Sequence, residues 1–253
     1  MSGRDARQDW RQFAAAAIPS KTSTPRLDAF LDGSVPAGDR GGRPTLLDVG
    51  CGDGRLALRM HDRGFDVTGI DVSDRAVEAA RQLAGDRGRL DHPPRFAVAD
   101  AAAGDTPVGL GEPFDVVVCQ LVVSIVGGPA DRDRLLRNCA ALLGAGGRLF
   151  ISASGVSAEV NADYARLYAE DAALTGEAFT YFSRDDAGRV LYATHHFSEA
   201  ELRGVIAAAG FVDIAIEAVL EASSRRPDER AIFLYATATK PSAHATHHRG
   251  IAT

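Results

Sequence analysis

Short apolar runs alternate with amphipathic helical patterns through the middle of the chain. The runs have the length of buried strands and occupy residues 46–49, 66–72, 96–99, 114–119 and 148–153. Several of the intervening segments carry apolar residues at helical spacing, at residues 55–63, 74–84 and 131–143. Regular alternation of this kind predicts an α/β fold with a doubly wound, mostly parallel sheet.

The pattern changes after the fifth run. Residues 155–196 contain a helical pattern and a pair of aromatic extended segments, which predict an insert after strand five. Ser198 and Glu201 then form the sequence of a capping box, so we expect a helix to start there. Apolar segments at residues 212–219 and 231–237 predict a closing antiparallel hairpin, which makes the sheet seven-stranded.

The ends of the chain are expected to lie outside the sheet domain. Residues 1–44 combine an amphipathic pattern around Trp10 and Phe13 with a stretch rich in glycine and proline. They predict an N-terminal helical lid and a linker. Residues 241–253 have no core-forming pattern and predict a disordered tail. The ligand-binding domain is therefore expected over residues 45–240.

Composition narrows the classes of function. With a net charge of -6 the chain lacks the diffuse basic field that binds nucleic acid, so we expect no nucleic-acid partner. Cys51, Cys119 and Cys139 are widely spaced and odd in number, so we expect no metal site and a reducing, cytoplasmic location. No apolar run approaches transmembrane length, so no membrane contact is expected. Abundant alanine, arginine, glycine and aspartate indicate a bacterial protein.

The segment DVGCGDG, from Asp48 to Gly54, follows the first strand and opens the first helix. Alternating glycines let a backbone turn tightly and approach a ligand without Cβ clashes. The N–H groups of a helix N-terminus favour a carboxylate, and Asp48 is placed to accept bonds from an ammonium group. A dinucleotide-binding loop has the form G-x-G-x-x-G, but here the third glycine comes one residue early and Arg55 follows it. Taken alone, the loop is also compatible with an ordinary turn.

Acidic residues at the next strand ends favour a ligand site. Asp71 ends the second strand, where a carboxylate can accept both hydroxyls of a ribose. Asp100 ends the third strand in the sequence VAD, where it can accept the exocyclic amine of adenine. Each acid alone is compatible with a strand end or a helix cap. Together, beside the glycine loop, they predict an adenosyl-binding site.

Five segments carry a resemblance to a known family, namely LLDVGCGDG, VTGIDVS, RFAVADA, FDVVVCQLVVSIV and LLGAGGRLFIS. Through them residues 46–153 resemble the core of the class I, Rossmann-like methyltransferases, with Ala145 where proline is common. The resemblance implies S-adenosylmethionine as the cofactor. It also implies cofactor contacts at Asp48, Gly50, Cys51, Gly52, Gly54, Asp71, Val72, Asp100, Ala101, Cys119 and Gln120.

The same resemblance implies transfer of a methyl group by in-line displacement, which mainly requires alignment of donor and acceptor and exclusion of water. Residues 119–122 are Cys-Gln-Leu-Val and lack the Asn/Asp-Pro-Pro-Tyr run of enzymes that methylate nucleic acid bases or glutamine side chains. Together with the acidic net charge, this favours a small-molecule acceptor. We expect a monomer or a homodimer.

The candidate catalytic residues lie in the insert, which roofs the acceptor pocket in related small-molecule enzymes. His195 and His196 are adjacent, so on an extended segment they point in opposite directions and at most one faces the pocket. One of them is a candidate base or acceptor-orienting group, and the alternative is that both are structural. Tyr181 belongs to an aromatic group that either packs the core or presents a ring to the sulfonium cation.

Two functions of other classes stay open at this point. The same fold supports enzymes that use the cofactor without moving its methyl group, for example by cyclising its aminobutyrate chain and releasing methylthioadenosine. The chain is also compatible with a cofactor-binding protein that has no turnover.

Overall fold

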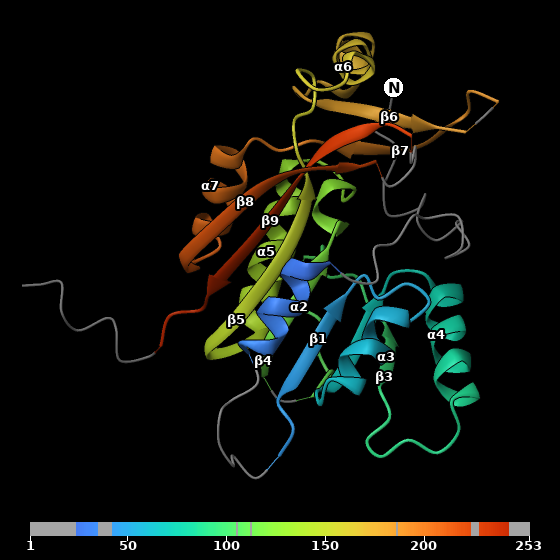
Figure 1. Cartoon of the computed structure of the whole chain (residues 1–253), viewed down its shortest axis with the longest axis vertical. Coiled ribbons are helices and arrows are strands. Elements are labelled where there is room, and N and C mark those ends of the chain that lie inside the picture. The colour runs from blue at the N-terminus through green and yellow to red at the C-terminus, as the bar shows by residue number, and fades with distance from the viewer. Residues whose placement is uncertain are drawn as a thin grey trace, which may run out of the picture.

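The computed structural model describes residues 24–34, 42–104, 106–111, 113–185, 187–223 and 228–242. Figure 1 shows a large twisted sheet flanked by helices, with a smaller unit above one end of it. Among the described residues, no helix combines the length and the apolar character needed to cross a bilayer.

The large sheet has seven strands in the order β3-β2-β1-β4-β5-β9-β8. Their bounds are β1 (Thr45–Val49), β2 (Asp66–Asp71), β3 (Arg95–Val98), β4 (Phe114–Gln120), β5 (Leu143–Ser154), β8 (Val212–Ala222) and β9 (Arg230–Thr239). The strands β1 to β5 pair in parallel, whereas β9 is antiparallel to both β5 and β8. This confirms the doubly wound sheet and its closing hairpin. The strand order reverses at β1 and β4, where ligands bind in sheets of this kind.

Helices cover both faces of the sheet, and each face has its own apolar core. One core includes residues of α2 (Pro25–Asp32), α3 (Arg55–Asp62) and α4 (Asp74–Asp86), and the other includes residues of α5 (Pro129–Leu142) and α7 (Glu199–Ala208). Local signals set the helix starts. Thr24, Ser73 and Ser198 each accept the backbone N–H three residues later, as N-cap residues do.

Two boundaries differ from the sequence prediction. The fifth strand was expected over residues 148–153, but β5 begins at Leu143, which pairs with Phe114 before the register shifts. Gly146, with φ 76°, accommodates the irregular backbone there. Ser198 caps α7 as predicted, but the Glu201 carboxylate of the expected capping box bonds His195 instead.

The described helix of the N-terminal region, α2, packs on the core. Leu27, Phe30 and Leu31 of α2 are buried in the core, and the Phe30 ring lies 5.4 Å from that of Phe150 in β5. An amphipathic helix that covers a sheet shows the same pattern as a lid, so the sequence did not distinguish them. Trp10, Phe13 and most of the expected tail lie outside the described residues.

The insert between β5 and α7 forms the smaller unit at the top of Figure 1. It contains α6 (Ala162–Thr175) and an antiparallel pair, β6 (Thr180–Arg184) and β7 (Val190–His195), as its aromatic segments predicted. The chain leaves the sheet and returns at neighbouring points, because the Phe197 N–H donates to the Ser154 carbonyl at 2.8 Å. The insert therefore starts and ends at neighbouring positions beside the carboxyl end of β5.

Candidate functional site

The loop after β1 has the conformation that its glycines allow. Gly50, Gly52 and Gly54 have φ angles of 74, 52 and 80°. The N–H groups of Gly50 and Cys51 both donate to the Ile70 carbonyl, at 2.8 and 2.9 Å, which fixes the loop to β2. A Cβ atom added to Gly52 would meet none of the described atoms within 4 Å. The middle of the loop therefore borders open space.

The strand-end acids organise the backbone around this space. Asp71 accepts the Gly52 N–H on one carboxylate oxygen at 3.0 Å and the Ser73 N–H on the other at 2.9 Å. Burial raises the pKa of Asp71, and these hydrogen bonds oppose the rise. Asp100 accepts the Ala102 N–H at 2.9 Å. Both acids are half-buried and lie at the carboxyl end of the sheet, as the sequence predicted.

Val72 and Ala101 follow these acids in the chain. Val72 is half-buried, whereas Ala101 is buried and its carbonyl accepts the Asn138 side-chain amide at 2.9 Å. Asn138 also donates to the Ala103 carbonyl at 3.2 Å, so α5 holds the loop after β3 in place. The sequence pattern gave no sign of this support.

Asp48 is buried without a complete set of partners. Its side chain is only 1% exposed, and its Oδ2 atom has no hydrogen-bond partner among the described residues. Burial, together with the charge of Asp71, raises the pKa of Asp48 to about 7. An unpaired buried carboxylate is unfavourable, so a cationic group beside it would be stabilised. This oxygen indicates a cation-bearing ligand at the end of β1.

The end of β4 packs directly on the glycine loop. Leu121 has φ 63°, a left-handed conformation that is uncommon for a residue with a Cβ atom. Its N–H approaches both the carbonyl and the hydroxyl oxygen of Ser152 at 3.0 Å. The next residue, Val122, lies so close to Gly50 that a Cβ atom added there would be 2.3 Å from Val122 Cγ2. Leucine gives no sequence signal for a positive φ angle, so the sequence did not predict this contact.

The Cys119 side chain is engaged on the side of α5. Its side chain is fully buried and hydrogen-bonds with Cys139 of α5, and that bond raises the pKa of the Cys119 thiol. Cys51 is also buried, which raises the pKa of its thiol. The Cys51 thiol donates to the Gly52 carbonyl at 3.8 Å. Gln120, at the end of β4, is half-buried.

The two histidines point in opposite directions, as their adjacency predicted. His196 is buried among the rings of Tyr164, Tyr168 and Tyr181, and its Nδ1 atom lies 2.6 Å from the Tyr168 hydroxyl. Burial and the charge of His195 lower the pKa of His196 to about 3, and a hydrogen bond with the Gly155 backbone opposes this shift. This ring is therefore neutral, and its Nδ1 atom is already paired with Tyr168. Tyr181 is equally part of the packed aromatic group, with burial raising its pKa.

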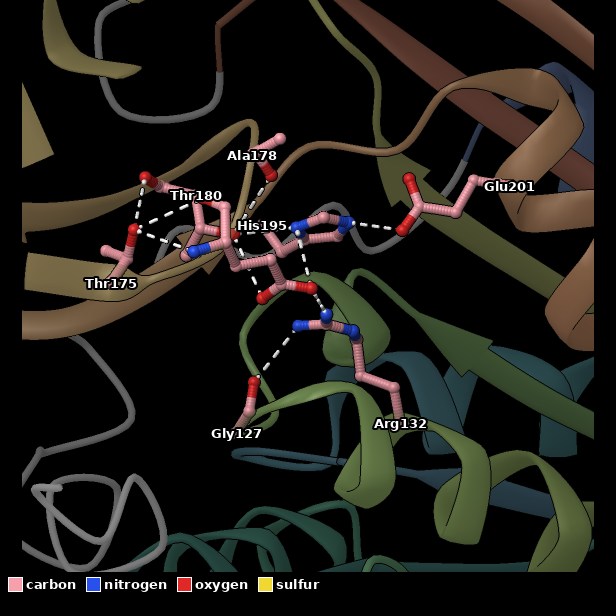
Figure 2. A network of polar contacts seen from close by, with 8 residues as sticks. Gly127, Arg132, Thr175, Ala178, Thr180, His195 and Glu201 are labelled. Atoms are coloured by element: carbon pink, nitrogen blue, oxygen red, sulfur yellow. Dashed lines mark hydrogen bonds and ion pairs between the residues drawn. The ribbon is translucent and has the colours of Figure 1, made fainter. Parts of the chain in front are cut away.

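His195 lies in a separate polar network, which Figure 2 shows. Its Nδ1 atom is 2.8 Å from the Thr180 hydroxyl, and its Nε2 atom is 2.9 Å from Glu201 of α7. Burial and the charge of Arg132 lower the pKa of His195 to about 4, and Glu177 opposes this shift. Both ring nitrogens have protein partners. The geometry therefore favours the structural interpretation of both histidines over that of a free general base.

Glu177, His195 and Glu201 together also resemble a set of metal ligands, because each offers an atom within 4.8 Å of the others. Arg132, however, forms an ion pair with Glu177, and its side chain is only 3% exposed. A metal ion there would face a buried guanidinium. The positive charge that these carboxylates attract is already supplied by the protein.

Comparisons with known proteins agree with this geometry. Residues 47–149 match a protein family described as a methyltransferase domain. A ubiquinone biosynthesis O-methyltransferase of Caulobacter vibrioides is 42% identical over 108 residues, which are 43% of this chain and 40% of that protein. The chain thus aligns with less than half the length of this curated relative. The family match at residues 47–149 includes the glycine loop.

Solved structures extend the likeness to the whole fold. A SAM-dependent methyltransferase of Methanosarcina mazei superposes with a TM-score of 0.73 at 23% identity, covering 87% of this chain and 99% of that one. A magnesium protoporphyrin IX methyltransferase of Synechocystis, solved with S-adenosylmethionine bound, has a TM-score of 0.59 at 18% identity and covers 95% of this chain and 99% of that one. The chain therefore has the fold of these class I methyltransferases, and residues 47–149 are similar to a methyltransferase domain. The cofactor of such domains is S-adenosylmethionine.

The residues around the glycine loop fit that cofactor. S-Adenosylmethionine carries an ammonium group and a sulfonium cation, and the orphaned Asp48 oxygen lies beside the glycine loop where a cation is needed. The open space at Gly52 leaves room for a ligand against the backbone. The half-buried carboxylates of Asp71 and Asp100 supply acceptors at the neighbouring strand ends.

Proposed function

We propose that this protein transfers a methyl group from S-adenosylmethionine to a small-molecule acceptor. The observation that carries the proposal is the buried, unpaired Asp48 oxygen next to a glycine loop with open space at Gly52. The chain covers only part of its curated relatives, so the activity of those proteins is transferred here as a proposal. Because the relatives are named O-methyltransferases, a hydroxyl group is the acceptor atom that we favour.

The chain's own residues divide the work of binding. Asp48 would hold the ammonium group, Asp71 the ribose hydroxyls and Asp100 the adenine amine. When bound, the cofactor supplies an electrophilic methyl group on a sulfonium. Val122 against Gly50 fixes the end of β4 beside the loop, so acceptor-side and cofactor-side elements keep one spacing.

The insert would exclude water and orient the acceptor. His195, His196 and Tyr181 were the catalytic candidates, but their polar atoms are engaged inside the insert. We therefore propose alignment and dehydration as the main contributions of this chain, with no base among these three residues. A cytoplasmic location and a monomeric or homodimeric state stay predictions from the sequence.

The direct test is incubation of the full chain with S-adenosylmethionine and a bacterial small-molecule extract, followed by mass spectrometry. Extract-dependent formation of S-adenosylhomocysteine with a methylated product supports the proposal. Methylthioadenosine would instead show the cyclising chemistry, and cofactor binding without either product would show a non-catalytic binding protein.

Asp71→Ala provides the matched control for this assay. We expect its affinity for S-adenosylmethionine to fall at least about tenfold, because the ribose loses a bidentate acceptor and the Gly52 N–H loses its partner. Unchanged affinity, measured by calorimetry, would contradict the ribose assignment while leaving the product assay valid.

A further inference from the structure

A buried arginine connects the insert to the core. Arg132 lies in the first turn of α5, in the core, and its side chain is 3% exposed. It forms an ion pair with Glu177, which belongs to the insert between α6 and β6. Its other terminal nitrogen donates to the Gly127 carbonyl at 3.0 Å. One guanidinium thus joins the insert to the segment that connects β4 with α5.

Further polar contacts within the insert hold Glu177 in place. The Thr180 hydroxyl lies 3.1 Å from Glu177 Oε2 and 2.8 Å from His195 Nδ1. His195 then reaches Glu201 of α7 at 2.9 Å. Figure 2 shows these groups converging from the insert, α5 and α7. We call Arg132, Glu177, Thr180, His195 and Glu201 the latch.

An aromatic ring completes the enclosure of the latch. Phe197, the residue at which the chain returns to the sheet, has its ring 5.7 Å from the Arg132 guanidinium and 4.5 Å from the His195 ring. Phe197 is 1% exposed, so it keeps water from that side of the ion pair. A charge pair in such surroundings holds its two segments in a narrow range of positions, because separating them leaves a charge buried and unpaired.

We propose that Arg132 is a positioning residue, which through the latch fixes the insert over the end of β4 and so sets the roof of the acceptor pocket. The identification of the insert as that roof rests on the proposed function. The connection of insert to core does not, because it follows from the contacts of Arg132 alone.

The chain offers a matched control inside the insert. Asp171 of α6 pairs with Arg184 of β6 at 2.6 Å and also accepts the Phe182 N–H at 2.8 Å. This pair is comparable in chemistry, with Asp171 only 2% exposed, but both partners belong to the insert. Its loss should loosen the insert internally without releasing it from α5 and α7.

The first test is hydrogen exchange on the full chain, comparing Arg132→Met with Arg184→Met. We expect Arg132→Met to speed amide exchange at least about tenfold both in residues 176–182 and in the segment 125–128, which Arg132 joins. Arg184→Met should speed exchange in α6 and β6 only. Equal patterns in the two variants, or no change at 125–128, would overturn the proposal.

A variant that keeps the charge covers the case in which Arg132→Met does not fold. Arg132→Lys retains a cation for Glu177 but lacks the second nitrogen that reaches the Gly127 carbonyl. We expect it to fold and to raise exchange at 125–128 more than at 176–182. Wild-type exchange in Arg132→Lys at both segments would contradict the joining role.

The pKa of His195 tests the electrostatic part of the proposal. A loss of packing alone would leave this pKa unchanged. The charged or titratable groups facing His195 are Arg132, Glu177, Glu201 and the neighbouring His196. Removing Arg132 leaves two carboxylates and no cation, so we expect the His195 pKa in Arg132→Met to rise by at least about one unit in NMR titrations. A His195→Gln variant assigns the resonance, and an unchanged pKa would overturn the electrostatic part of the proposal.

Cofactor binding separates this proposal from the proposed function. The latch contains none of the residues assigned to S-adenosylmethionine, so the affinity of Arg132→Met for it should stay within about threefold of the wild type. A larger loss would show that Arg132 acts on the cofactor site and would contradict the positioning role. If no S-adenosylhomocysteine forms in the product assay, the exchange and titration results still decide whether the latch exists.

Discussion

The glycine loop and the insert differ in whether their buried polar groups have hydrogen-bond partners. At the end of β1, Asp48 is buried with an unpaired oxygen, and the space at Gly52 is open. In the insert, the buried polar side chains of Thr180, His195 and His196 all have protein partners. The first region is incomplete without a ligand, whereas the second is satisfied by itself.

This difference indicates a ligand-binding role for the glycine loop and a structural role for the polar network of the insert. A buried carboxylate oxygen without a partner is stabilised when a donor or a cation binds beside it, so Asp48 indicates a binding site. A buried network with complete hydrogen bonds instead specifies one arrangement of the chain. Histidine at a plausible position is therefore weaker evidence for catalysis than an orphaned carboxylate is for binding.

Gly50→Ala should produce the largest effect on the cofactor region. The new Cβ atom would lie 2.3 Å from Val122 Cγ2, at a residue with φ 74°. The left-handed conformation costs about 1–2 kcal/mol for a residue with a Cβ atom, and the overlap adds about 1–3 kcal/mol. We expect the loss of most cofactor binding and a lower urea midpoint, measured by calorimetry and unfolding.

Two further variants separate the conformational cost at Gly50 from the cost of the steric overlap with Val122. Val122→Ala in the Gly50→Ala background should recover the part due to overlap, because it removes the methyl group that collides. Gly52→Ala keeps only the conformational term for folding, since a Cβ atom there meets none of the described atoms within 4 Å, yet it projects into the ligand space. Equal stability losses in Gly50→Ala and Gly52→Ala would argue against the Val122 contact.

Asp48→Asn should stabilise the unliganded protein and weaken cofactor binding. The pKa of Asp48 rises from 3.8 to about 7 on folding, so the wild-type protein loses stability as the pH rises from about 4 through about 7. At pH 8 the full penalty is up to about 4 kcal/mol, which Asn removes. Affinity for S-adenosylmethionine should fall at least about tenfold. A variant that is less stable at pH 8, or one that binds normally, would contradict the role of this carboxylate.

The insert should show the opposite dependence on pH. His195 and His196 have pKa values lowered from 6.5 to about 4 and about 3, so both stay neutral in the folded chain. Their contribution is fully present above about pH 6.5 and is lost as the pH falls toward 4, by up to about 2 kcal/mol per histidine at pH 4.5. Urea unfolding at a series of pH values measures this loss. A His196→Gln variant should flatten part of the curve, and an identical slope would contradict burial of a neutral ring.

Much of the sheet and of the cofactor region could be predicted because their signals are local. Strand-length apolar runs, the glycines at 50, 52 and 54, and an acid at each strand end are fixed by backbone geometry within a few residues. The opposite orientation of His195 and His196 also follows from strand geometry, and their contacts with α7 and α6 confirm it.

The remaining features depend on contacts between distant segments. Leu121 adopts its left-handed turn because Ser152 of β5 accepts its N–H, and Cys119 points away because Cys139 lies behind β4. The partner of Glu201 is His195, although the local pattern assigned its carboxylate to the helix cap. Sequence spacing carries no information about such pairs, since tertiary packing overrides the local preference.

The hydrogen bond between the Phe197 N–H and the Ser154 carbonyl has a consequence for how this protein can change. The two ends of the insert meet at the edge of the sheet. The pairing of β5 with β9 runs from Arg148 to Ser154 and involves no residue of the insert. Loop-closure entropy grows slowly, by about 0.6 kcal/mol for each doubling of length. Segments of very different size can therefore be exchanged between these two points during evolution or engineering. The same cofactor platform could then serve a new acceptor without refolding of the sheet.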